Sequence, residues 1–191
     1  MVTGAPEAPA PSSVALLRGV NVGGKKVIAM SELAACFREA GYEDVRTYIQ
    51  SGNVLFTAER AEGPELEDAI EKVLEKRFQV PILVVVRSRE QLAATIAAAP
   101  ADHGSEELRS DVFFLKHPLT AEEAFAQLPE LRAGVDAVAC GPGALYFSRV
   151  AAQASTTRIT RFMSKPIFRQ VTARNWRTTT RLLELLEPPP P

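Results

Sequence analysis

Apolar alternation and apolar positions spaced by three or four residues divide the first half of the chain into six elements. They are a strand at 14–18, a helix at 31–40, strands at 45–50 and 54–57, a helix at 65–78 and a strand at 82–86. Ser51-Gly52-Asn53 supplies turn chemistry between the second and third strands, which predicts a hairpin. The order βαββαβ is that of the ferredoxin-like fold.

The pattern then begins again without an obvious last strand. A connecting helix at 89–98 precedes a strand at 111–116, a helix at 120–127, strands at 137–140 and 144–150, and a long helix within 172–186. Residues 151–170 are polar and cationic and are interrupted by Pro166, so they form either a short helix or a loop. The predicted fold class is α+β, with a ferredoxin-like N-terminal half, a second, degenerate βαββα half and a C-terminal helix.

Proline marks both ends of the chain, since seven of the fourteen prolines lie in the two tails. Such tails are expected to be disordered. The predicted organisation is a tail at 1–13, the ferredoxin-like half at 14–98, the second α+β half at 99–150, a basic loop and helix at 151–187, and a proline tail at 188–191.

The composition indicates a cytoplasmic protein that does not enter a membrane. No stretch approaches the roughly 18 apolar residues of a membrane span, and residues 1–13 have neither the basic start nor the apolar run of a signal peptide. The two cysteines, Cys36 and Cys140, are too few for a disulfide framework in 191 residues. They are predicted to be buried free thiols.

The net charge of −1 conceals an uneven distribution. No acidic residue occurs from Ala137 to Leu183, and the same stretch holds eight arginines and lysines. Such asymmetry suggests an anionic partner, either a nucleotide or a nucleic acid. The alternative is a basic face that pairs with the protein's own acidic helices.

Three blocks of sequence resemble one bacterial family. They are Leu16-Leu17-Arg18-Gly19-Val20-Asn21-Val22-Gly23-Gly24-Lys25, then residues 45–56, and Thr172-Ala173-Arg174-Asn175-Trp176-Arg177-Thr178. The chain resembles the family known as domain of unknown function 1697. The resemblance implies an α+β fold with a ferredoxin-like N-terminal half and implies no activity. Between Ser148 and Ser164 the chain departs from the family's pattern, which leaves open any site built there.

The first block nearly matches a phosphate-binding motif. Gly19-x-x-x-x-Gly24-Lys25 fits Walker A, but Lys26 replaces the hydroxyl residue that would hold Mg²⁺. Three residues also separate the loop from the next helix, so no helix N-terminus faces the loop's lysine. Either the loop binds a simple anion, or its glycines only turn the chain and Asn21 bonds its own loop.

A candidate site follows from the predicted sheet, in which the first and third strands are central neighbours. The loop after the first strand and the hairpin tip before the third then meet at one sheet edge, unless Ser51 and Asn53 only supply turn chemistry. Arg174, Arg177 and Arg181 are expected on one stripe of the last helix. The candidate ligand-binding residues are Arg18, Asn21, Gly23, Gly24, Lys25, Ser51, Asn53, Arg174 and Arg177.

Three functions remain open at this point. The favoured one is a module that binds the phosphate of a nucleotide or nucleic acid. The second is an enzyme on a small anionic substrate, with Arg18 and Lys25 as electrostatic stabilisers. The third is a structural protein that forms homo-oligomers through its sheet. No catalytic residue is assigned, no spacing suits a metal, and no cofactor is expected.

Overall fold

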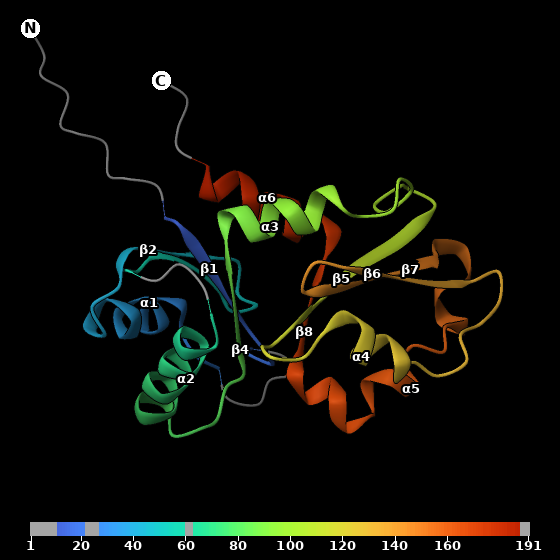
Figure 1. Cartoon of the computed structure of the whole chain (residues 1–191). Helices are drawn as coiled ribbons and strands as arrows, with labels where there is room; N and C mark the ends of the chain where they lie inside the picture. Colours follow the sequence, from blue (N-terminus) through green and yellow to red (C-terminus); the bar gives the residue numbers. More distant parts are fainter. Residues whose placement is uncertain (1–10, 22–26, 60–62, 188–191) are drawn as a thin grey trace, which may run out of the picture.

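Two four-stranded antiparallel sheets, with helices packed on them, form the molecule (Figure 1). The computed structural model describes residues 11–21, 27–59 and 63–187. The first sheet has the order β2-β3-β1-β4, and the second has the equivalent order β6-β7-β5-β8. The strands are β1 (Ser13–Leu17), β2 (Glu43–Tyr48), β3 (Asn53–Thr57), β4 (Val84–Ser88), β5 (Leu108–Leu115), β6 (Asp136–Gly141), β7 (Ala144–Val150) and β8 (Val171–Asn175). The predicted α+β class is confirmed.

Each sheet has its own helical layer, and two further helices lie side by side over the join (Figure 1). The first sheet packs on α1 (Met30–Glu39) and α2 (Pro64–Phe78). The second packs on α4 (Ala121–Ala126), α5 (Thr160–Met163) and the 3₁₀ turn η2 (Pro166–Gln170). A further 3₁₀ turn, η1 (Ala151–Thr156), follows β7 and has no buried residue. Helices α3 (Arg89–Ala97) and α6 (Trp176–Leu186) follow the last strand of each half.

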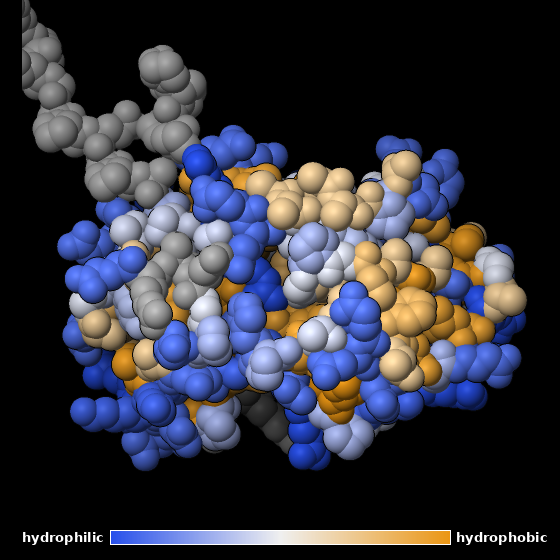
Figure 2. All heavy atoms as spheres, in the orientation of Figure 1, coloured by the Kyte–Doolittle hydropathy of each residue, from blue (hydrophilic) through white to orange (hydrophobic). Residues whose placement is uncertain are grey.

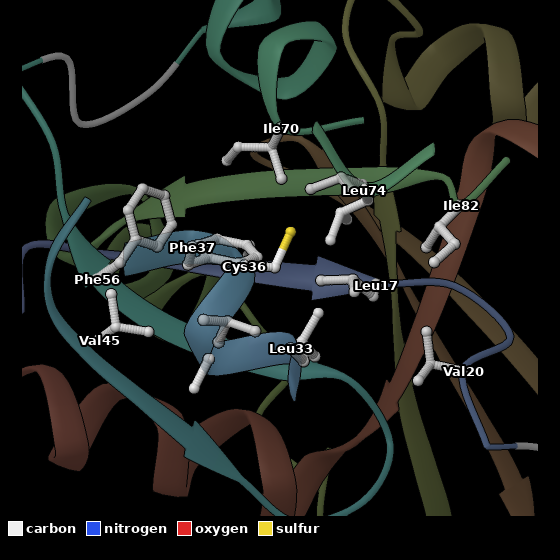
Figure 3. Close-up of a cluster of buried hydrophobic side chains, with 14 of the residues drawn as sticks. Leu17, Val20, Leu33, Cys36, Phe37, Val45, Phe56, Ile70, Leu74 and Ile82 are labelled. Carbon is white, nitrogen blue, oxygen red and sulfur yellow. The ribbon is translucent and has the colours of Figure 1, made fainter. Parts of the chain in front are cut away.

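Three apolar cores follow from the alternation along the strands. Ala15 and Leu17 face the core beneath α1 and α2, which also holds Phe37 and Leu74 (Figure 3). Val14 and Leu16, which alternate with these residues on β1, face a second core. This second core also takes residues from β5, β7 and α6, so it joins the two halves. The third core lies beneath α4, α5 and η2.

The final strand of the second half corrects the sequence-based prediction. The last helix is predicted within 172–186, but residues 171–175 form β8, which pairs with β5. Helix α6 begins at Trp176, and the Asn175 side chain caps it by accepting a hydrogen bond from the N–H of Thr178 at 2.7 Å. Arg174 is therefore on a strand and does not share a helical stripe with Arg177 and Arg181.

Two arginines cross the join between the halves in equivalent positions. Arg87 on β4 donates through Nη2 to the carbonyl oxygens of Leu115 at 2.6 Å and Gly143 at 2.9 Å. Arg174 on β8 donates through Nη2 to those of Leu17 at 2.9 Å and Gly52 at 3.2 Å. In both cases the acceptors are the end of a central strand and the tip of a hairpin in the opposite half.

The hairpin tips need glycine at the points where the arginines arrive. Gly52 has a φ of +75°, and a Cβ there would lie 2.9 Å from the Cβ of Leu17. Gly143 has a φ of +60°, and a Cβ there would lie 2.9 Å from Nη2 of Arg87. Only glycine combines this backbone conformation with so close an approach. The two halves are therefore an internal repeat joined by the same device used twice.

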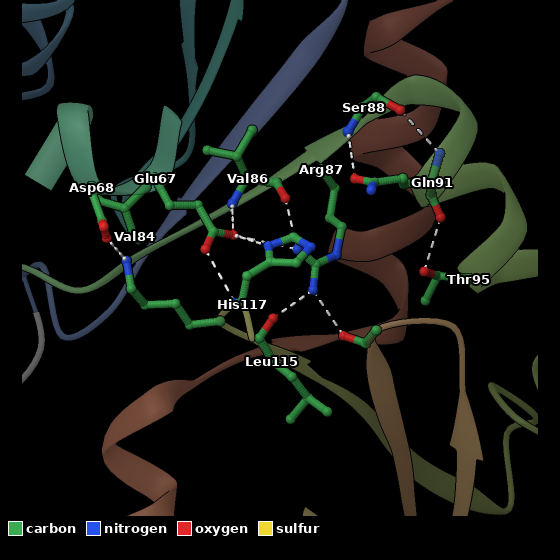
Figure 4. A network of polar contacts seen from close by, with 12 residues as sticks. Glu67, Asp68, Val84, Val86, Arg87, Ser88, Gln91, Thr95, Leu115 and His117 are labelled. Carbon is green, nitrogen blue, oxygen red and sulfur yellow. Dashed lines mark hydrogen bonds and ion pairs between the residues drawn. The ribbon is translucent and has the colours of Figure 1, made fainter. Parts of the chain in front are cut away.

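The hydrogen-bonding groups of the two buried arginines are satisfied in different ways. Arg87 lies 3.5 Å from the carboxylate of Glu67, which has no exposed surface and also accepts from the N–H groups of Val86 and His117 (Figure 4). Arg174 is 7% exposed and has only neutral acceptors among its described partners, including Asn53 Oδ1 at 2.5 Å. Burial lowers the pKa of Arg174 to about 10, so its guanidinium stays charged at neutral pH.

Replacing Arg174 by leucine is expected to destabilise the protein by about 3 kcal/mol, because several buried carbonyl oxygens lose their donor. Arg177→Ala is the matched control, since Arg177 is exposed, and it is expected to change stability by no more than about 0.5 kcal/mol. Equilibrium unfolding in urea measures both. Equal stability of the two variants would show that Arg174 does not hold the halves together.

Candidate functional site

Four of the residues predicted from the sequence gather at the first hairpin tip. The Asn53 amide donates to Tyr48 O at 2.9 Å and Ser51 Oγ at 3.0 Å, and its oxygen accepts from Arg174. Asn21 donates to Gln50 O at 3.1 Å. The convergence expected from adjacent first and third strands is therefore observed, and these side chains are already engaged with one another and with the main chain.

Asn21 also bonds both polar backbone groups of Ile28. Its amide donates to Ile28 O at 2.9 Å, and its oxygen accepts from Ile28 N at 2.8 Å. The side chain thus acts as a backbone group would in a strand pair, with a φ of 58° at Asn21 itself. This arrangement matches the alternative in which Asn21 bonds its own loop.

The remaining predicted residues lie apart from this cluster. The guanidinium of Arg18 donates to Phe168 O on η2 and sits 5.0 Å from the centre of the Phe168 ring. Burial, with a smaller contribution from Arg169, lowers the pKa of Arg18. Arg177 is exposed in the first turn of α6. Gly23, Gly24 and Lys25 lie outside the described residues, so the anion-binding loop stays a prediction.

A more open site lies on the second half, where the sequence analysis placed none. A cleft of about 560 Å³ lies where the end of the second sheet meets η1 and α5. In the first half, the 15-residue helix α2 lies between β3 and β4. In the second half, the equivalent segment between β7 and β8 contains the four-residue helix α5. Because the shorter cover leaves one end of the sheet unprotected, a cleft remains there.

The cleft has an apolar interior. Phe113 and Phe147 lie on the sheet, and Ile159 and Met163 lie on the opposite wall. In the view of Figure 2 the surface of the second half is also the more apolar of the two. Met163 is 46% exposed, which is high for so apolar a side chain. Phe113, Phe147 and Ile159 are at most 3% exposed, so the apolar surface open to a small molecule comes mainly from Met163 and the alanines of the lining.

Charged side chains line the mouth of the cleft. Arg109 on β5 stands directly opposite Arg149 on β7, a cross-strand placement in which like charges repel. Arg149 donates to Asp111 Oδ2 at 3.0 Å and lies over the Phe147 ring. Arg109 is exposed and has no hydrogen bond or ion pair with any residue that the structure describes. The three charges leave a net positive charge at the mouth.

A half-buried group of hydrogen bonds fixes the far wall of the cleft. Asp136 on β6 accepts from Thr157 Oγ1 at 2.5 Å and from Arg158 N at 2.8 Å. Burial favours a higher pKa for Asp136, but these hydrogen bonds and one from Arg132 N hold the pKa below its usual value. The wall is thus tied to the sheet edge, and Ser155 and Thr160 add hydroxyl groups to the lining.

The cysteines, possible metal ligands and possible membrane helices can also be compared with the sequence-based predictions. Cys36 is buried and free as predicted, but Cys140 is exposed because edge strand β6 carries it. No three metal-ligating side chains gather among the described residues. Across the same residues, no helix combines the length and apolar character needed to cross a membrane.

Comparison with known proteins identifies the family. A family described as "Protein of unknown function (DUF1697)" matches residues 11–146, so the chain belongs to this family and the resemblance is confirmed. The conserved bacterial protein SP0830 from Streptococcus pneumoniae has a similar fold, with a TM-score of 0.81. The two chains share 24% identity over 93% of this chain and 99% of that one. No curated protein matches the chain.

Asn21→Ala is expected to speed hydrogen exchange of the Ile28 amide about tenfold, because that N–H loses its acceptor. Ser51→Ala removes one hydrogen bond at the same hairpin and is expected to leave the exchange rate of the Ile28 amide unchanged. Amide exchange followed by NMR compares the two variants. Unchanged protection of Ile28 in Asn21→Ala would contradict the structural role of Asn21.

Proposed function

We propose that this DUF1697 protein binds a small amphipathic anion in the cleft of its second half. The observation that carries this proposal is Arg109, which has no side-chain partner among the described residues and lies opposite Arg149 at the mouth of a cleft of about 560 Å³. The anionic group lies between the two guanidinium groups. The apolar part lies against Met163 and the exposed alanines Ala152 and Ala173 of the lining.

The electrostatics of the mouth favour an anion. Asp111 engages Arg149 and leaves Arg109 without a partner among the described residues. A carboxylate, sulfonate or phosphate between the arginines removes their repulsion and accepts charge-assisted hydrogen bonds from both. The cavity volume lies within the range of about 300–1,000 Å³ that is typical of small-molecule sites. A concave apolar cleft fits a small molecule better than a nucleic acid strand.

The site proposed here differs from the one predicted from the sequence, and the anionic ligand is the shared element. Asn21, Ser51, Asn53 and Arg174 have their polar groups engaged within the protein, which supports a structural role. The loop containing Lys25 and the cytoplasmic location stay predictions. No catalytic side chain is assigned to the cleft, so the proposed function is binding.

The probe for this proposal is 8-anilinonaphthalene-1-sulfonate, which combines an aromatic body with a permanent anion. Arg109→Gln is expected to weaken its binding about tenfold at pH 7.5, the loss expected for one charged hydrogen-bond partner. Isothermal titration calorimetry measures the affinity. Increasing the salt concentration is expected to weaken binding to the wild-type protein by screening the arginines.

Arg177→Gln is the matched control, since it removes one exposed arginine outside the cleft. It is expected to bind the probe as the wild type does. Equal affinities for Arg109→Gln and Arg177→Gln, or no binding to the wild-type protein, would exclude the cleft as the anion site.

A further inference from the structure

The turn between α3 and β5 buries a histidine with an unsatisfied nitrogen. His103 is only 7% exposed, and its Nε2 has no hydrogen-bond partner in the described chain. The ring packs edge-on against Trp176, with centroids 4.9 Å apart, and against Tyr146, with centroids 5.5 Å apart. A buried polar atom without a partner is unusual and calls for an explanation.

The same turn is fastened to the strand that forms the cleft. The N–H of Gly104 donates to Ser110 Oγ at 2.9 Å, and Ser110 lies between Arg109 and Asp111 on β5. Gly104 also packs so closely beneath the indole that a Cβ there would lie 2.1 Å from Trp176 Cδ1. The turn, the first residue of α6 and the cleft strand therefore form one packed unit.

The surroundings of His103 favour the neutral ring. Two nearby carboxylates, Asp102 in the same turn and Asp111 on β5, act to raise its pKa. Burial is the larger influence and lowers the pKa of His103 below its usual 6.5. The aromatic neighbours bring no charge, since burial raises the pKa of Tyr146 to about 12 and its hydroxyl donates to Thr95 O.

We propose that His103 is a proton-operated latch that controls the cleft. Protonation places a cation where Nε2 meets no hydrogen-bond acceptor among the described residues, and the ring is released from Trp176 and Tyr146 to relieve this. The turn then loses its hold on Ser110, and Arg109 and Asp111 lose their support. This last step, the effect on ligand binding, rests on the proposed function of the cleft.

The direction of the pH dependence follows from the two states of the ring. The unfolded or released ring takes up a proton near pH 6.5, while the packed ring resists protonation to a lower pH. The latched state is therefore fully stable above pH 6.5. It loses stability as the pH falls from that value through the lower pKa of the packed ring.

The composition allows a direct test, because Trp176 is the one tryptophan and His103 and His117 are the two histidines. Trp176 emission is recorded from pH 8 to pH 4.5 for the wild type, His103→Phe, His103→Gln and His117→Gln. A transition below pH 6.5 is expected in the wild type and in His117→Gln and is expected to vanish in both His103 variants. Far-UV circular dichroism checks that each variant stays folded, and the phenylalanine variant preserves the aromatic packing.

Absence of the transition in the wild type, or its survival in His103→Phe, would overturn the latch. A second measurement, titration of 8-anilinonaphthalene-1-sulfonate at pH 7.5 and pH 5.0, separates the latch from the cleft. Affinity is expected to fall about tenfold at the lower pH in the wild type and to stay constant in His103→Phe. If the probe fails to bind at pH 7.5, the cleft proposal is wrong, while the Trp176 transition still decides the latch.

If Trp176 shows its transition and the wild-type affinity is equal at both pH values, then the latch does not control the cleft. The probe suits this comparison because its sulfonate keeps its charge throughout the range. Any change in affinity therefore comes from the protein.

Discussion

The join between the two halves depends on arginines that bind backbone carbonyl groups. Each guanidinium leaves its own last strand and reaches the end of a central strand and a hairpin tip in the opposite half. Because the acceptors belong to the main chain, the join requires a backbone shape, with glycine at the hairpin tip, more than it requires particular partner side chains. Both sheets and the core between them are held by this geometry.

The local patterns of the sequence predict most of the helices and strands, and they predict the contact between the first loop and the hairpin. Strand β8 was missed for a physical reason. Arginine is rarely buried. The five residues 171–175 combine apolar and polar types without clear alternation, so Arg174 was assigned to an exposed helical stripe with Arg177. Its burial depends on carbonyl groups of Leu17 and Gly52, more than 120 residues away along the chain.

The cleft was beyond prediction for a related reason. Arg109 and Arg149 are 40 residues apart and meet only because of the register between β5 and β7. The charge asymmetry did identify Arg149 as part of a basic segment, but the structure distributes that segment among several roles. Arg158 pairs with Glu130 and Arg181 with Glu184 on its own helix, whereas Arg149 reaches the cleft.

The repeat explains why the cleft lies on one half only. In the first half, α2 covers its sheet and supplies Glu67, Asp68 and Glu71, which hold Arg87, Lys116 and His117 at the join (Figure 4). The shorter α5 contains no carboxylate, and Arg174 has only neutral acceptors among its described partners. The first half thus provides the charged anchors of the join, and the second provides the open space in which a ligand can bind.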